Sequence, residues 1–192
     1  MAAFVAMFAA GVGVAAVPTK SASRQPRITA VRANADAHVT AATRAANYGH
    51  YRRLSIDGRP VVRTYVSFVV AGGPGKVRRV NLLLYSYTRS SLGYRVRLAL
   101  GNWKERRITF ANAPRFSSRF VASGPLRART WKAVDVTSLV GAVEGVTSFA
   151  LTTVGIQAIE LASRESGLTG PRLVVERKQP RPVTEPPPPP TA

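Results

Sequence analysis

The sequence predicts an all-β protein, an antiparallel β-sandwich of jelly-roll type with about ten strands and one short helical turn. Between residues 36 and 176, apolar side chains recur at every second position in short runs, which is the spacing of strands. Turn residues such as Asp57-Gly58 and Gly170-Pro171 separate these runs. No helical segments alternate with the runs, as parallel crossovers would require, so two packed antiparallel sheets are expected.

The candidate strands follow one another along the chain. The clearest three are Val62–Val70, Val77–Thr88 and Tyr94–Leu100, in which apolar and polar residues alternate. A helical turn is predicted over residues 137–143. The remaining candidate strands are residues 37–41, 54–56, 108–110, 119–122, 131–136, 146–153, 156–162 and 172–176.

The two ends of the chain differ from this middle part. Residues 1–17 are uncharged and mostly Ala, Val, Phe and Gly, which is typical of a secretory signal, and they are short for a membrane span of about 20 residues. We expect a basic linker over residues 18–35, the module over 36–176 and a proline-rich, extended tail over 177–192. This organisation predicts a protein that is secreted or held in the cell envelope, with a single-pass anchor as the alternative.

Composition favours binding over catalysis. The chain has 28 Lys and Arg against 9 Asp and Glu, a formal net charge of +19, which favours anionic partners. The absence of Cys excludes disulfides, thiol catalysis and Cys-ligated metals, and two His and nine scattered acids leave little for a catalytic site. We therefore expect no enzyme activity, no cofactor, no membrane contact in the mature form, and a monomer. His38 and His50 have no third ligand nearby and predict no metal site, whereas structural calcium at Asp36 or Asp135 stays open.

Several segments in a fixed order carry a resemblance to a known family. These segments are Ala35–Val39, Asn47–Gly49, Arg63–Phe68, Asn102–Glu105, Ile108–Pro114, Val134–Val140, Phe149–Leu151, Ser163–Glu165 and Pro171–Val175. Together they resemble the DNRLRE-type domain, also classed as carbohydrate-binding module family 96, over about 140 residues, from residue 36 to residue 175. Two positions depart from the family's pattern: Phe110 stands where Trp is usual, and Leu161-Ala162 precede Ser163 where a larger residue is expected.

The resemblance implies a jelly-roll sandwich found in secreted bacterial and archaeal proteins. Such modules are non-catalytic, are often joined to extracellular enzymes, and in some members bind acidic polysaccharide such as alginate. A fused or neighbouring extracellular enzyme is therefore an expected partner. Most motif residues are expected to hold the fold together, in particular Asp135, Arg164 and Glu165.

Strand alternation predicts where a ligand binds. Because successive side chains point to opposite faces, Val80, Leu82 and Leu84 should face the core and leave their neighbours outside. If sequential strands are also neighbours, one sheet face carries both guanidinium groups and flat tyrosine rings. Each guanidinium can bind a carboxylate with two parallel hydrogen bonds. The predicted face comprises Arg63, Tyr65, Arg79, Tyr85, Tyr87, Arg95 and Arg97, and a loop cluster of Arg44, Tyr48, Tyr51, Arg52, Arg53 and Arg59 could extend it.

Other functions stay open from the sequence. Outward arginines also keep a sheet surface soluble, and a strongly basic chain can bind nucleic acid or any polyanion through charge alone. No nucleic-acid motif is present, so no specific nucleic acid is expected. A structural envelope protein that holds anionic wall polymers would use the same surface. The preferred prediction is a non-catalytic extracellular module that binds anionic polysaccharide.

Overall fold

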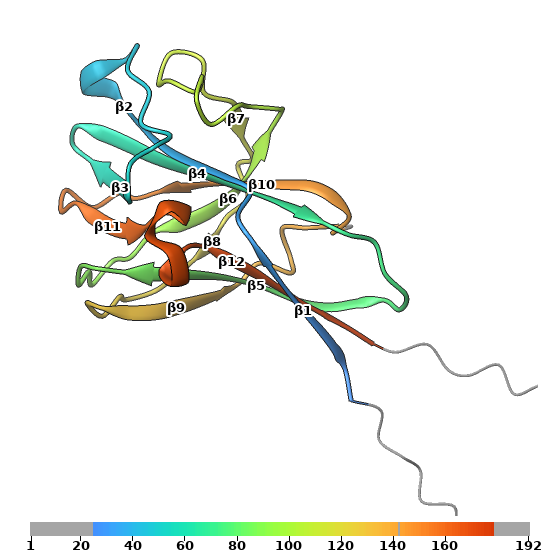
Figure 1. The fold of residues 1–192 in the computed structure, drawn as a ribbon. Helices are drawn as coiled ribbons and strands as arrows, with labels where there is room; N and C mark the ends of the chain where they lie inside the picture. The colour runs from blue at the N-terminus through green and yellow to red at the C-terminus, as the bar shows by residue number, and fades with distance from the viewer. Residues whose placement is uncertain (1–24, 142, 179–192) are drawn as a thin grey trace, which may run out of the picture.

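The structure, a computed structural model, describes residues 25–141 and 143–178 (Figure 1). The described residues form strands and two short 3-10 helices, so the all-β prediction is confirmed. The elements are β1 (Arg27–Arg32), β2 (Ala35–Thr40), η1 (Ala41–Thr43), β3 (Arg53–Gly58), β4 (Val61–Val70), β5 (Val77–Ser86), β6 (Arg95–Leu100), β7 (Arg115–Phe116), β8 (Val121–Ala122), β9 (Thr130–Asp135), β10 (Gly145–Thr152), β11 (Ile159–Ala162), η2 (Arg164–Thr169) and β12 (Arg172–Arg177).

The strands form two layers, both antiparallel. In layer A, β5 lies between β9 on one side and β12 and β11 on the other, β1 pairs with β12, and β3 pairs with β11. In layer B, β4 and β6 flank β10, β2 pairs with β4, and β7 and β8 pair with β6. The last residues of β3 pair with β4, so this strand links the two layers. Figure 1 shows the layers stacked, with the two ends of the described range side by side where β1 meets β12.

The core between the layers follows the predicted alternation. Val80, Leu82 and Leu84 of β5 are fully buried, as are Val66 and Phe68 of β4 across from them. Each such side chain contributes about 1.5–3 kcal/mol through burial. Large apolar residues therefore hold the layers together, and their chain neighbours remain for the two outer faces.

A second, smaller core covers part of the outer face of layer B. Ala37 and Tyr65 project outward from β2 and β4 and are fully buried, because residues 99–116 fold over them. Ile108 from this covering segment is also buried, and Trp103 packs against the cluster. The segment that lies over layer B thus belongs to the folded domain and fixes what the outer face can expose.

Four expectations about single elements were wrong. Residues 137–139 form a turn in place of the expected helix, closed by the Leu139 amide donating to the Val136 carbonyl at 2.9 Å, and the short helices lie at η1 and η2. Residues 108–110 belong to the covering segment and make no strand, while β7 was not predicted. A third of the expected linker, Arg27–Arg32, is strand β1, which pairs along its whole length with β12.

The signal-like segment at residues 1–17 and most of the proline-rich tail, from residue 179 on, lie outside the described residues. Within the described part of the chain, no helix is long and apolar enough to cross a membrane.

Candidate ligand-binding surface

The predicted binding residues do not share one face. Arg63, Arg95 and Arg97 belong to β4 and β6 of layer B, whereas Tyr85 and Tyr87 belong to β5 or follow it in layer A. The two sets lie on opposite outer faces of the sandwich. The single-face prediction was wrong because β5 and β6, although consecutive in sequence, belong to different layers.

Tyr65 points outward from layer B as alternation requires, but it is fully buried under the covering segment. Its hydroxyl donates to the Pro114 carbonyl at 3.0 Å, and burial raises the pKa of this phenol. The expectation that Tyr65 is exposed to a ligand was wrong, because alternation gives the side of the sheet and not what lies over it.

Arginine and phenylalanine side chains alternate across the outer face of layer B. Each guanidinium lies over a ring, and rings are shared by successive arginines, so the contacts form one continuous ladder. Such contacts are worth about 0.5–1 kcal/mol each at exposed sites. Guanidinium carbon to ring centroid distances are 5.0 Å for Arg44 to Phe110, 4.9 and 5.3 Å for Arg63 to Phe110 and Phe116, 5.5 and 4.9 Å for Arg97 to Phe116 and Phe120, and 4.5 Å for Arg95 to Phe120.

Strand register explains why this ladder borders a hollow. Strand β10 runs between β4 and β6 and places Thr152 opposite Arg95 and Ala150 opposite both Tyr65 and Arg97. These small side chains leave space between the larger ones, a pocket of about 240 Å³ lined in part by Arg63, Arg95, Arg97, Phe116 and Thr152.

A second hollow continues the first along β6. It has a volume of about 200 Å³ and shares Arg95, Thr153 and Val154 with the first pocket. Its lining includes Leu92 and Phe120, which are 62% and 44% exposed. The two hollows make one groove, which we call the basic groove, with arginines and exposed apolar side chains along it.

The arginines of the ladder carry positive charge that no ion pair within the described residues compensates. Among the described residues, Arg44, Arg63 and Arg95 make no ion pair with a carboxylate. Arg97 donates from Nη1 to the carbonyls of Ser117 and Ser118 at 3.0 and 2.6 Å, so it mainly holds the strand connection in place. One acid, Asp57, lines the groove together with Arg63, Arg95 and Arg97. The lining therefore carries a net positive charge.

The outer face of layer A combines aromatic rings with ion-paired arginines. Tyr85 packs edge to face against Tyr87 and Trp131, with centroids 5.4 and 5.6 Å apart. Arg53 lies over the Tyr87 ring at 4.8 Å and pairs with Glu160. Trp131 was not predicted as a surface residue of interest, although alternation along residues 131–136 places it outside with Ala133.

Two further arginines of layer A, both on β5, are ion-paired with acids, whereas Arg172 contacts a ring and makes no ion pair within the described chain. Arg79 pairs with Asp135 at 3.4 Å, and Arg78 pairs with Glu176 at 3.1 Å. The guanidinium of Arg172 lies over the Trp131 ring at 5.1 Å.

The predicted loop cluster is dispersed. Arg44 joins the ladder through Phe110, whereas Arg53 turns to layer A. Tyr48 stacks on His38 at 4.6 Å, and Tyr51 packs edge-on against both rings. Two members take part in backbone hydrogen bonds: the Arg52 carbonyl accepts from Ser163 and Ser166, and the Arg59 amide donates to Asp57.

Motif residues hold the covering segment, as the resemblance implied. Asn47 donates from Nδ2 to the carbonyls of Glu105 and Ile108, both at 2.7 Å. Asn112 accepts from the Thr109 amide at 2.7 Å and donates to the Arg107 carbonyl at 2.8 Å. These amides fix the loop that carries Phe110, so they act on the groove indirectly.

Acidic residues that could hold a metal ion gather elsewhere. Asp36, Glu105 and Glu165 place one carboxylate oxygen each within 4.8 Å of one another. Arg164 holds Glu105 with two hydrogen bonds of 2.7 and 2.9 Å and contacts Glu165 at 3.0 Å. Asp135, the other acid considered for calcium, lies apart from this cluster and binds Thr137 and Arg79.

The fold is an antiparallel β-sandwich with a basic groove on the outer face of layer B. The model of one protein family, carbohydrate-binding module family 96, matches residues 27–177. The chain belongs to this family, and the match includes strand β1 at one end and all of β12 at the other. A comparison with curated proteins found no match.

Proposed function

We propose that this module binds anionic polysaccharide, a uronic-acid polymer such as alginate or an anionic cell-wall polymer, in the basic groove. The observation that carries the proposal is the Arg–Phe ladder, whose arginines make no ion pair with a carboxylate within the described chain. Membership in a family of carbohydrate-binding modules supports the class of ligand.

The groove has the chemistry that such a polymer needs. A guanidinium that is stacked on a ring keeps its N–H edge available, and this edge matches a carboxylate with two parallel hydrogen bonds. Exposed apolar side chains, of which Phe120 and Val154 are 44% and 65% exposed, offer area to the apolar faces of sugar rings. Exposed charge contacts contribute only about 0–1 kcal/mol each, so affinity comes from several contacts along one chain.

We further propose that the protein acts outside the cytoplasm, by binding alone, next to an extracellular enzyme. The uncharged segment 1–17 and the proline-rich tail support this placement. Binding without catalysis is supported by the carboxylates of Glu105, Glu160 and Glu176, each of which is held by an arginine.

The decisive experiment compares two double variants that lower the net charge equally. Arg63→Gln with Arg95→Gln removes guanidinium groups from the basic groove, and Arg53→Gln with Arg79→Gln removes two from layer A. In alginate-containing native gels and by calorimetry, we expect at least about tenfold weaker binding for the groove variant, since two contacts of about 1 kcal/mol are lost. The layer A variant should stay within about twofold of the parent. Equal losses in both variants would contradict the proposed site.

Charge alone is the competing explanation, and conservative variants separate it. Arg63→Lys with Arg95→Lys keeps the net charge but removes the planar fork. Several-fold weaker alginate binding is expected, together with weak binding of DNA and polyglutamate by the parent. If the parent bound alginate, DNA and polyglutamate equally well, and the double Lys variant kept the parental affinity for each, binding would be non-specific polyanion binding instead.

A further inference from the structure

Three carboxylates from distant parts of the chain meet at one end of the sandwich. Asp36 lies in β2, Glu105 in the covering segment and Glu165 in η2, and one oxygen of each lies within 4.8 Å of the others. The Asp36 amide donates to Glu105 at 2.9 Å, and the Arg164 amide donates to Asp36 Oδ2 at 2.7 Å. Backbone and side chains therefore hold the three groups in place.

The cluster contains carboxylate oxygens that lack a partner. Asp36 is 1% exposed, yet its Oδ1 makes no hydrogen bond, and the buried Oε2 of Glu165 makes none either. Two residues before Glu165 in the sequence, the fully buried Ser163 hydroxyl also makes no hydrogen bond. A buried oxygen without a partner costs about 1–3 kcal/mol, and more when it is charged, so a ligand is needed to compensate it.

The charge of the cluster is also unbalanced. Three carboxylates face a single guanidinium, Arg164, which engages both oxygens of Glu105 and only Oε1 of Glu165. A formal charge of about −2 remains, which one divalent cation would cancel. We propose that Asp36, Glu105 and Glu165 bind a calcium ion that joins β2, the covering segment and η2.

Calcium fits the donors better than other ions do. All of the side-chain donors are oxygens, which hard cations prefer. With Ca–O distances of about 2.3–2.6 Å, two ligands on opposite sides of one ion lie up to about 5 Å apart, and the cluster stays within that span. Magnesium needs shorter distances and a stricter octahedron.

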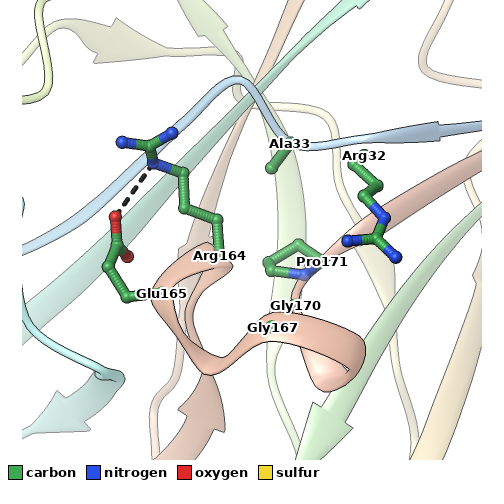
Figure 2. A pocket seen from close by; sticks show the side chains of 7 residues that line it. All are labelled: Arg32, Ala33, Arg164, Glu165, Gly167, Gly170 and Pro171. Carbon is green, nitrogen blue, oxygen red and sulfur yellow. Dashed lines mark ion pairs between the residues drawn. The ribbon is translucent and has the colours of Figure 1, made fainter.

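A pocket adjoins the cluster at Glu165, the one proposed ligand that lines it. Figure 2 shows Arg164 and Glu165 on one side of this pocket and Arg32 on the other, with Gly167 and Pro171 between them. Its volume is about 370 Å³. Glu165 and Glu105 keep 24% and 12% of their side chains exposed, so the site can be reached without unfolding.

Protonation of Asp36 is the alternative way to reduce the negative charge of the three carboxylates. Burial raises the pKa of the Asp36 carboxyl to about 7, and Glu165 and Glu105 raise it further while hydrogen bonding to Arg164 lowers it. The test is therefore run at about pH 8, where the carboxyl is mostly ionised and protons compete least with the metal.

The test uses the full chain, stripped with a chelator and without polysaccharide. Calorimetric titration with CaCl₂ should show one site, and at about 100 times its Kd calcium should raise the Tm by about 5–10 °C relative to NaCl of equal ionic strength. Asp36→Asn and Glu165→Gln should abolish this response, while Glu160→Gln, an ion-paired acid in layer A, should keep it. If Asp36→Asn fails to fold, the Glu165→Gln variant alone decides the test, because Glu165 is partly exposed.

Three outcomes would overturn the proposal. They are no calcium response at pH 8, a response that survives Glu165→Gln, and an equal response to MgCl₂.

Discussion

The two outer faces of the sandwich use the same residue types for different chemistry. Both carry arginines packed on aromatic rings. In layer A, acidic residues accompany the arginines, and Arg78 and Arg79 are paired with Glu176 and Asp135. In layer B, the groove arginines Arg63 and Arg95 stack on phenylalanine without such an acid in the described chain. The position of the few carboxylates, more than that of the many arginines, therefore sets the electrostatic difference between the two faces.

The largest expected difference between the faces concerns stability. Tyr65 of layer B is fully buried, whereas Tyr85 of layer A is only half-buried. Tyr65→Ala should lower the free energy of unfolding by about 3–5 kcal/mol through the cavity it leaves, and Tyr85→Ala by less than about 1.5 kcal/mol. Urea denaturation followed by circular dichroism measures both. Similar losses would mean that the covering segment does not pack on Tyr65 as the structure has it.

A finer variant tests the hydroxyl of Tyr65 alone. Tyr65→Phe removes only the donor to the Pro114 carbonyl and should cost about 1 kcal/mol. Polysaccharide binding should stay unchanged, because Tyr65 does not reach the groove surface.

Salt dependence sharpens the comparison for binding. Each cation that neutralises a polymer charge releases counterions, so affinity falls with salt in proportion to the contacts made, by analogy with nucleic acids. Removing Arg63 and Arg95 should reduce the slope of log affinity against log salt by about 2. The variant without Arg53 and Arg79 has the same net charge and should keep the parental slope. If both variants lost slope equally, the polymer would contact arginines of both faces, and the basic groove would not be the specific site.

An aromatic pair with matched exposure gives a smaller effect. Phe120 in the groove is 44% exposed, and Trp131 in layer A is 39% exposed. Phe120→Ala should weaken alginate binding about 3- to 10-fold, which is the usual worth of an aromatic contact of about 0.5–1.5 kcal/mol. Trp131→Ala should leave it within twofold. The reverse result, above all together with binding of a neutral glucan, would move the sugar site to layer A.

The sequence predicted the fold well where strands are half-buried. Val80, Leu82 and Leu84 are buried and alternate with less buried neighbours, and this period of two predicts both their burial and the strand. Strand β1 was not predicted because five of its six residues are exposed where it pairs with β12. Without a buried side, packing imposes no alternation of apolar and polar residues on the strand. Strand β7 is two residues long and is fixed only by pairing with β6, which leaves no local signal.

The site was predictable in its residue types and not in its arrangement. Alternation gave Arg95 and Arg97 an outward direction, which the structure confirms. Which strands share a layer depends on long-range pairing, so the placement of Tyr85 and Tyr87 with Arg63 failed. The phenylalanines of the ladder lie in a two-residue strand or in loops, where alternation along a strand cannot predict the direction of a side chain. Their role could have been suspected only from rings spaced among arginines over residues 110–120.

The smallest predicted effect concerns Asp135, the acid at the end of β9 in layer A. Hydrogen bonds from the Thr137 hydroxyl and amide, helped by Arg79, hold the pKa of Asp135 below its usual value. Because the folded pKa lies below the unfolded one, ionised Asp135 stabilises the fold above about pH 4, and this contribution is lost as the pH falls through the folded pKa. The side chain is 52% exposed, so the effect should stay a fraction of that of a buried pair.

Asp135→Asn keeps an oxygen to accept from Thr137 but cannot titrate. Between about pH 5 and pH 2.5, it should therefore lose slightly less stability than the parent does in urea denaturation. The groove variant lacking Arg63 and Arg95 serves as the control, and its stability should follow the parental pH dependence, because neither arginine is paired with an acid that titrates in this range. A change of acid dependence in the groove variant would reveal a carboxylate partner for these arginines and would remove the electrostatic distinction between the two faces.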